Sequence, residues 1–400
     1  MKHLLNESVW TRTKEALCEG LDGNRAKVMD VVLENTRKHL VGRAGILTEA
    51  ATAGATSAGN IATLNKVILP VIRRVMPSVI ANEIIGVQPM TGPVAQIHTL
   101  RVRYSDTVPA AGGGVTAGQE ALSPFNIARY YSGNEVVANP RAAATAMLEG
   151  RPGNRMSIQV LKETVEAKTR KLAARWTFEA AQDAQSQQGI DIEAEIMAAL
   201  AQEIVAEIDQ EILMSLRALP AVGATFDQAN VSGTATFVGD EHAALAILIN
   251  QQANLIAART RRGAGNWVVV SPTALTILQS ATTSAFARST EGVFEAPTNT
   301  KFVGVLNSNM RVYVDQYAND ATPVLVGYKG SGEIDAAAYY CPYVPLTSSG
   351  VIVDPQTFEP VVSFMTRYGY IELTNTASSL GNSADYLGLI NINTATLAFS

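Results

Sequence analysis

The side chains that could do chemistry are few and lie far apart in the sequence. The chain has four histidines, and none has a histidine partner four residues away, the spacing that places two metal ligands on one helix face. They are His3, His39, His98 and His242. His242 follows two acidic residues at the start of a predicted helix and is interpreted as part of a solvated helix terminus. Cys341 has no histidine nearby in the sequence, which favours a packed thiol over a nucleophile. We therefore predict no metal, no cofactor and no covalent catalyst.

A glycine-containing segment, Gly263 to Asn266, is the remaining candidate for ligand chemistry. A phosphate-binding loop follows a strand and opens a helix, so that its backbone N–H groups point at the anion. Here a helical pattern precedes the glycines and a strand pattern, Trp267–Val270, follows them. This order favours a helix stop, with Gly263 as the C-terminal cap. The sequence contains neither a GxxxxGK[ST] loop nor a GxSxG elbow.

Composition bounds the class of protein. Four hundred residues suffice for two or three domains, and 47% hydrophobic with 17% charged residues is ordinary for a globular chain. A net charge of −5 argues against tight nucleic-acid binding through a basic face. Two cysteines, Cys18 and Cys341, fit a reducing compartment, and no disulfide is expected between them. The N-terminus lacks the apolar core of a signal peptide, and the longest strongly apolar run, Ala243–Ile249, is too short to span a bilayer.

The N-terminal third shows three kinds of segment. Residues 8–40 read as two amphipathic helices broken at Asp22–Asn24, because apolar residues recur at helical spacing on either side. Residues 50–60 carry no charge and no large side chain, which predicts a flexible or extended arm. Residues 64–85 again have a helical pattern, interrupted at Pro77.

Residues 95–170 predict a long two-stranded excursion. In residues 95–104 apolar and polar side chains alternate, which predicts a strand with one face in solvent. A similar alternation returns near 157–170. Between them, residues 106–156 contain seven glycines and few large apolar residues, and a compact domain rarely holds so long a structureless loop. An isolated hairpin is only marginally stable in water, so we expect the excursion to lie against another copy of the chain.

The remaining residues predict a mixed α+β fold. Residues 191–218 form the clearest helix, with Asp191 as N-cap, Arg217 near the negative end and Pro220 after it. Its apolar residues recur every four positions, so the stripe spirals and should contact different elements at its two ends. Other expected elements are helices over 241–262 and 272–279, strands at 267–270 and 323–328, a hairpin of 302–306 and 310–315, and strands within 339–373.

Two adjacent motifs resemble a known family. Val71–Pro77 (VIRRVMP) followed by Gly86–Met90 (GVQPM) is similar to the signature of the major capsid proteins of T4-like contractile-tailed bacteriophages. Further blocks follow in the order expected for that family: Glu166–Arg170, Glu179–Asp183, Glu203–Ile208, Thr260–Asn266, Arg311–Tyr317, Val326–Gly330, Tyr339–Val344 and Thr366–Gly369. Each block alone is weak, but the ordered series covers roughly residues 40 to 370.

The resemblance implies an HK97-type capsid fold and a division of the chain. Residues 1–49 would be a helical prepiece, 50–95 an N-terminal arm and helix, and 96–170 an extended hairpin loop. Residues 171–234 and 336–400 would form a peripheral domain with a spine helix at 191–218, and 235–335 an axial domain. No space remains for the domain that the T4 protein carries as an insertion in the loop region.

The resemblance also implies proteolytic processing. In this family the maturation protease cuts after a glutamate in a Leu/Ile-x-Glu motif. Leu47-Thr-Glu49 fits that motif and leaves Ala50 as the new N-terminus, between the helical prepiece and the arm.

Charged residues are interpreted as contacts between subunits rather than as a DNA site, because acids are plentiful and the chain is net negative. The expected contact residues are Arg73, Arg74, Glu163, Glu166, Arg170, Arg259, Arg261 and Arg262.

The family function is a non-enzymatic capsid protein in the virion. It would assemble in the host cytoplasm into hexamers, with the same or a related chain at pentameric vertices. The implied partners are other copies, a portal, a scaffold, a prohead protease and decoration proteins, with packaged DNA touched only non-specifically and no membrane. Three alternatives stay open: a pentameric vertex paralogue, an encapsulin-like compartment shell, and an enzyme with an unrecognised site.

Overall fold

The structure is a computed structural model. It describes residues 7–18, 26–35, 79–108, 115–119, 121, 131, 142, 145–150, 152–188, 191–220, 222–230, 238–260, 262–281, 286–288, 301–332, 335–357, 359–373 and 382–397. The chain divides into two compact units. The first unit comprises residues 1–95, 165–213 and 339–371, and the second comprises 96–164, 214–338 and 372–400.

Two helices open the first unit, as the sequence predicts. They are α2 (Glu7–Cys18) and a second helix at residues 26–35. Lys14 Nζ lies 2.7 Å from Asp30 Oδ1, and Trp10 Nε1 donates to Glu34 Oε2 at 3.0 Å, so the two helices are tied at two levels. The second helix buries residues at helical spacing, namely Val28, Met29, Val32 and Leu33.

A five-stranded sheet forms the core of the first unit. Its order is β1 (Gly86–Val87), β11 (Ala338–Ser348), β13 (Pro360–Glu372) and β12 (Ile352–Val353), with β4 (Lys168–Arg175) also paired to β13. The short helix α5 (Ala81–Ile84) leads into β1, which runs parallel to β11. Along β13, buried and half-buried residues alternate, as expected for a strand with one core-facing side. The helix α7 (Phe178–Gln188) follows β4.

The predicted long helix is confirmed as α8 (Ile192–Ala218). Asp191 Oδ1 accepts hydrogen bonds from the N–H groups of Glu193 at 3.1 Å and Ala194 at 3.4 Å, which is N-cap geometry. The predicted stripe is half-buried near the N-terminus and fully buried from Ile204 onward through Ile208, Ile212 and Leu216. The helix runs without interruption from the first unit into the second, whose first residue in α8 is Met214.

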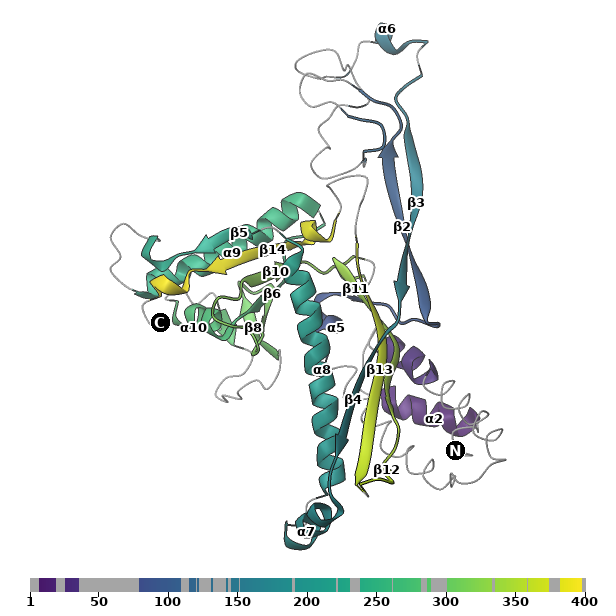
Figure 1. Cartoon of the computed structure of the whole chain (residues 1–400). Helices are drawn as coiled ribbons and strands as arrows, with labels where there is room; N and C mark the ends of the chain where they lie inside the picture. The colour runs from purple at the N-terminus through teal and green to yellow at the C-terminus, as the bar shows by residue number, and fades with distance from the viewer. Residues whose placement is uncertain are drawn as a thin grey trace. The chain divides into compact units, whose positions relative to one another are not determined.

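The second unit contains a seven-stranded sheet with the order β5-β14-β10-β6-β9-β8-β7, and Figure 1 labels five of its strands. The strands are β5 (Val222–Phe226), β14 (Leu387–Ile392), β10 (Val324–Gly327), β6 (Trp267–Val270), β9 (Met310–Val314), β8 (Lys301–Leu306) and β7 (Phe286–Arg288). Helices α9 (Val238–Thr260) and α10 (Pro272–Ser280) pack on each other and share one hydrophobic core with the sheet. Short helical turns are η2 (Gln228–Asn230), η3 (Ser383–Tyr386) and η4 (Thr394–Thr396).

The predicted hairpin of β8 and β9 is confirmed, and its turn shows why. Asn307 and Ser308 have φ angles of 52° and 62°, a left-handed conformation that asparagine tolerates better than most residues. The side chain of Asn307 donates to Asn250 Oδ1 at 2.7 Å, so the hairpin tip is held against α9.

A two-stranded ribbon is formed by β2 (Val94–Tyr104) and β3 (Met156–Glu166), which run side by side in Figure 1. At one end the Ser105 N–H donates to Arg155 O at 2.9 Å, and at the other the Ala167 N–H donates to Pro93 O at 2.9 Å. These two bonds define an antiparallel pair about eleven residues long. The helix α6 (Thr145–Leu148) lies between the two strands in the sequence.

Several predicted boundaries and surroundings differ from the structure. The ribbon ends at Glu166 instead of 170, because β4 leaves it to pair with β13. The expected peripheral segments, 171–234 and 336–400, contain β5 and β14, and the structure pairs these two strands with each other and β14 with β10 inside the second unit. The sequence pattern of a strand indicates that the strand pairs but does not identify its partner.

Two residue-level interpretations were wrong. His242 is buried, and its Nδ1 lies 2.5 Å from Ser280 Oγ, because α10 packs over the first turns of α9. Gly263 does not cap α9, which ends at Thr260, and Gly263 is not among the glycines with positive φ. A Cβ at Gly263 would lie 2.5 Å from the ring of Tyr328, so close packing is what requires glycine there.

Candidate assembly surfaces

The β2–β3 ribbon exposes apolar side chains. Met156, Ile158 and Val160 alternate along β3 and are 50%, 69% and 56% exposed. Residues Ser157 and Gln159, on the opposite face, are exposed as well, so this part of β3 is open to solvent on both sides. Exposed apolar side chains gathered on one strand are typical of a surface that another protein covers.

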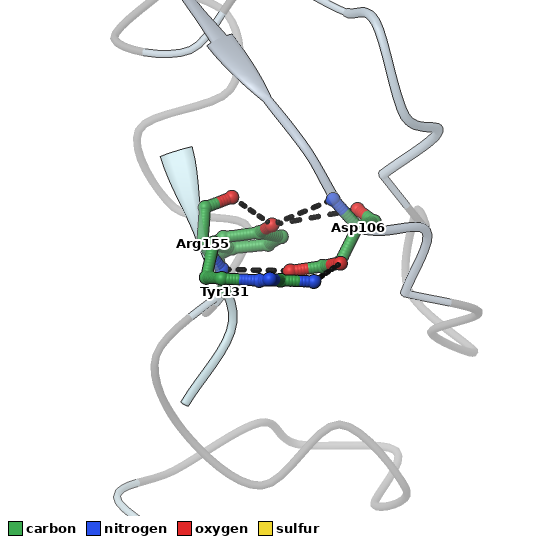
Figure 2. A network of polar contacts seen from close by, with 3 residues as sticks. All are labelled: Asp106, Tyr131 and Arg155. Carbon is green, nitrogen blue, oxygen red and sulfur yellow. Dashed lines mark hydrogen bonds and ion pairs between the residues drawn. The ribbon is translucent and has the colours of Figure 1, made fainter. Parts of the chain in front are cut away.

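A polar cluster closes the end of the ribbon (Figure 2). Asp106 Oδ2 accepts from the Arg155 N–H at 2.8 Å, and Asp106 Oδ1 lies 3.5 Å from Arg155 Nη2. The Tyr131 hydroxyl donates to Arg155 O at 2.7 Å and accepts from the Asp106 N–H at 3.1 Å. The backbone hydrogen bond from Arg155 is the main cause that lowers the pKa of Asp106; burial opposes it, and the Arg155 side chain lowers the pKa further.

A small hydrophobic cluster supports these contacts. The rings of Tyr104 and Tyr131 are 4.5 Å apart, and Val108, Val115 and Ala121 are buried beside them. The backbone of Val108 pairs with that of Val115. We call this set, with Asp106 and Arg155, the ribbon latch. It joins the two ends of the excursion within one chain, so the described part of the excursion has a core of its own.

Arg170, expected at a subunit contact, has three partners in its own chain. Its guanidinium donates to Tyr368 Oη, Glu207 Oε2 and Glu211 Oε2, each at 2.6 Å. Tyr368 also donates to Glu211. Burial opposes the ionised form of Glu211, but hydrogen bonds from Tyr368 and Arg170 outweigh it and lower its pKa. Burial, followed by the hydrogen bond to Glu211, raises the pKa of Tyr368. The cluster therefore fastens β4 and β13 to α8 within the first unit.

The other predicted contact residues fall in three groups. Arg262 is 54% exposed but pairs with Asp335 at 2.6 Å, and Tyr328 donates to the same carboxylate at 3.2 Å. Glu163 is half-buried and Glu166 exposed on β3, while Arg259 is half-buried in the last turn of α9. Arg73, Arg74 and Arg261, and the processing residues Leu47, Glu49 and Ala50, lie outside the described residues.

Sequence reasoning missed two buried polar contacts. Arg217 forms an ion pair with the fully buried Asp315 at 2.9 Å. The sequence predicts only that a positive charge near the C-terminal end of the helix interacts favourably with the helix dipole. Asn35 is buried and donates to Met90 O at 2.8 Å and Tyr343 O at 3.2 Å, which anchors the helix at 26–35 to the first unit. No periodicity reveals either contact, because the partners are distant in the sequence.

Among the described residues no group of three or more histidine, cysteine or acidic residues could hold a metal ion. Cys341 is buried, and burial raises the pKa of its thiol to about 12, so it is a packed thiol as predicted. Nor does any helix in this part of the chain have the length and apolarity to cross a membrane.

Comparison with known proteins places the chain in a class of virion structural proteins. It is 30% identical over 418 residues to the major capsid protein of Vibrio phage KVP40, covering 82% of this chain and 80% of that protein. It is 29% identical over 402 residues to the major capsid protein of Enterobacteria phage T4, covering 79% of this chain and 76% of that protein.

The family follows from a second comparison. The model of the family described as major capsid protein Gp23 matches residues 61–392, so the chain belongs to the Gp23 family of major capsid proteins. This confirms the resemblance and places the chain among capsid proteins and not among enzymes. Two solved capsid structures are also similar. The capsid of Myoviridae phage XM1 matches with a TM-score of 0.43 and 13% sequence identity, and the match covers 77% of this chain and 90% of that one. The capsid of cyanophage P-SCSP1u matches with a TM-score of 0.44 and 10% sequence identity, and the match covers 79% of this chain and 88% of that one. The predicted α+β class is confirmed, because the described residues form three sheets together with helices.

Proposed function

We propose that copies of this chain form hexamers that tile an icosahedral or prolate phage head around double-stranded DNA. The same chain or a related one would fill the pentameric vertices. The observation that carries the proposal is the family match over residues 61–392, whose relatives are named major capsid proteins. Residues 235–335 would be the axial domain, and α8 would be the spine helix of the peripheral domain.

The ribbon supports a role in joining subunits. Its exposed residues Met156, Ile158 and Val160 have hydrophobic side chains that gain free energy when covered, about 25 cal/mol per Å² of apolar area removed from water. One such contact is small, but a closed shell repeats it at every subunit. The ribbon latch would present this surface in a fixed form. Glu163 and Glu166 on the same strand would face basic residues of the neighbouring copy, Arg73, Arg74, Arg259 and Arg261 among them.

Processing after Glu49 would release residues 1–49, and assembly would proceed through a scaffold and a prohead protease. The helices at 7–18 and 26–35 are fastened to the first unit by Asn35 and by buried apolar residues. Cleavage alone would therefore leave a peptide still bound by non-covalent contacts, and its departure would require these contacts to break. Mass spectrometry of mature particles tests this step: an intact Met1–Glu49 segment would refute it.

Electron microscopy of the chain, expressed with its scaffold and protease, tests the proposal as a whole. Uniform hollow shells built from this chain are the expected result. Small discrete oligomers, with the ribbon still exposed, would refute it.

A further inference from the structure

The two edges of the β2–β3 ribbon differ. On the outer edge of β2, the Tyr104 N–H donates to Gln119 O at 3.0 Å, and the Gly118 N–H donates to Tyr104 O at 2.8 Å. Two residues earlier on the same edge, Val102 O accepts from the Ala121 N–H at 2.7 Å. Where β2 approaches the ribbon latch, its outer edge is therefore already hydrogen-bonded within the chain.

The outer edge of β3 has no such cover. The two backbone bonds that close the ribbon at its ends fit one register, in which Tyr104 and Met156 form a pair without mutual hydrogen bonds. The N–H and C=O groups of Met156, and of every second residue after it, therefore point away from β2. These residues include Ile158, Val160 and Lys162. In the described part of the chain, β3 pairs with β2 and with no other strand.

The same stretch of β3 is apolar. Met156, Ile158 and Val160 lie on one face of the strand, and Ile158 at its centre is the most exposed of the three. Lys162 is the first charged residue of β3, and no proline or glycine precedes it in the strand. A long apolar edge of this kind binds another strand, because the added strand satisfies the open backbone groups and covers the side chains.

The added strand must come from another copy if it belongs to this protein and resembles β3 in length. β3 is separated from β4 by the single residue Ala167, which is too short a connection for β4 to turn back along the β3 edge. The partner strand must also leave its own edge open. Among the described strands of eight residues or more, β4 and β3 itself remain as candidates.

The charge of β4 makes it a poor partner. β4 pairs with β13 on one side, and Lys171, Ala173 and Arg175 are exposed along it. Its sequence contains four cations and no acid. Addition of β4 would place these cations beside the apolar residues of β3 and beside Lys162. A second copy of β3 brings apolar residues instead.

We propose that β3 pairs with β3 of a second copy, antiparallel and centred on Ile158, about a two-fold axis. Ile158 would lie opposite Ile158 of the partner subunit, and Met156 opposite Val160 of the partner subunit. A slide of two residues would place Met156 opposite Lys162 in one direction and Val160 opposite Asn154 in the other. The centred register is thus the one in which all three apolar side chains meet apolar side chains. The two lysines would lie roughly 25 Å apart along the strands, where salt screens their repulsion.

The symmetry of this pair says which copies it joins. Copies within a ring meet head to tail through two different surfaces, whereas a two-fold contact uses the same surface twice. The β3 pair would therefore join copies in neighbouring capsomers and form a four-stranded sheet from two ribbons. This inference rests on the proposed assembly into a shell, and it names the contact that would connect one capsomer to the next.

A disulfide can locate the axis. Bonded pairs in an antiparallel ladder have Cα atoms about 5.5 Å apart, which a disulfide spans. In the full chain with Cys18→Ser, Ile158→Cys should therefore give a covalent dimer when assembled shells are mildly oxidised. Val160→Cys is the matched control, because its two copies would lie about 13 Å apart along the strands and should not dimerise. A mixture of Met156→Cys and Val160→Cys copies should cross-link although neither does so alone.

Proline substitutions test the hydrogen bonds of the same pair. Val160→Pro removes an N–H that points away from β2, so the bonds of the ribbon itself remain while the symmetric pair loses two. The yield of the Ile158→Cys dimer should fall about tenfold or more in this background. Thr164→Pro makes the same change on the same edge, outside the proposed pair, and should leave the yield unchanged. Circular dichroism of each unassembled variant should match that of the parent chain, because both residues are exposed.

The outcomes separate this inference from the proposed function. If shells form but Ile158→Cys gives no dimer, or Val160→Cys alone gives one, the β3 pair is refuted and the proposed function stands. Equal effects of the two prolines would refute the pair as well. If the unaltered chain forms no shells, the proposed function fails. An Ile158→Cys dimer in solution would then still support the β3 pair, and its absence would refute both.

Discussion

Replacement of Arg217 by methionine should destabilise the second unit strongly. Arg217 is only 14% exposed and its partner Asp315 is fully buried, with 2.9 Å between Nη1 and Oδ2. Removal of the guanidinium would leave a buried carboxylate with the Tyr317 N–H as a remaining donor. Loss of one member of a buried ion pair costs about 3–5 kcal/mol, whereas loss of a cation near a helix C-terminus costs only about 0.3–1 kcal/mol. The free energy of unfolding thus distinguishes the two descriptions of Arg217.

The assay follows the fluorescence of Trp267, which is buried in β6 of the same unit. A background with Trp10→Phe and Trp176→Phe leaves Trp267 as the single reporter. A loss of about 4 kcal/mol, with a slope of about 2 kcal/mol per molar urea, would lower the unfolding midpoint by about 2 M. The control Arg311→Met makes the same chemical change at an exposed position of β9 and should cost less than about 0.5 kcal/mol.

A double-mutant cycle completes the test. Asp315→Asn removes the charge, so Arg217→Met should cost clearly less in the Asp315→Asn background than in the unaltered chain. If Arg217→Met costs below about 1 kcal/mol, or costs the same in both backgrounds, the pair does not stabilise the unit as described.

Three further predictions concern separate contacts. Gly327→Ala should destabilise the second unit by about 3 kcal/mol in the same urea assay, because a Cβ there would lie 2.0 Å from Trp267, and an unchanged midpoint would contradict this packing. Asn35→Ala should cost about 1–3 kcal/mol and speed amide hydrogen exchange in residues 26–35, while exchange equal to that of the parent chain would refute the anchor. Hydrogen bonds lower the pKa of Glu211 below 4.5 in the folded state despite burial, so its contribution to stability is complete above that pH and is lost as the pH falls through the lowered pKa. The thermal unfolding midpoints of the parent and of Glu211→Gln should therefore differ at pH 7, and the difference should shrink as the pH falls below 4.5. A difference that stays constant with pH would argue against the Arg170 cluster.

The sequence predicts elements well where the signal is local. The bounds of α8 follow from an acidic N-cap, a four-residue apolar repeat and a proline, all within thirty residues. The β8–β9 hairpin follows from two apolar runs around an asparagine-rich turn. These features depend on neighbouring residues, so no tertiary information is needed to find them.

Prediction fails where the partner is remote. β14 has the pattern of a buried strand, but nothing in that pattern selects β5 and β10 over the sheet of the first unit. Asp315 pairs with Arg217 across 98 positions, and Asn35 bonds to Tyr343 across 308. His242 has the sequence surroundings of an exposed helix start, and only the packing of α10 buries it.

Glycine content and strand patterns predict the ribbon, but its exposed apolar residues are a property of the folded chain. Arg170 and Arg262 were expected to reach a neighbouring copy because charge alone does not show whether an acid lies nearby in the same chain. The structure gives both residues such an acid.

The position of β14 has a consequence for synthesis of the protein. β14 lies between β5 and β10, and it pairs Leu389 with Val222 and Val324 with Ile390. While the ribosome is still translating, β10 therefore presents an open sheet edge, and α9 lacks part of the surface on which it packs. A polypeptide that terminates early cannot close this gap. Truncated products are thus left with an unfinished second unit, which would keep defective copies out of the growing particle.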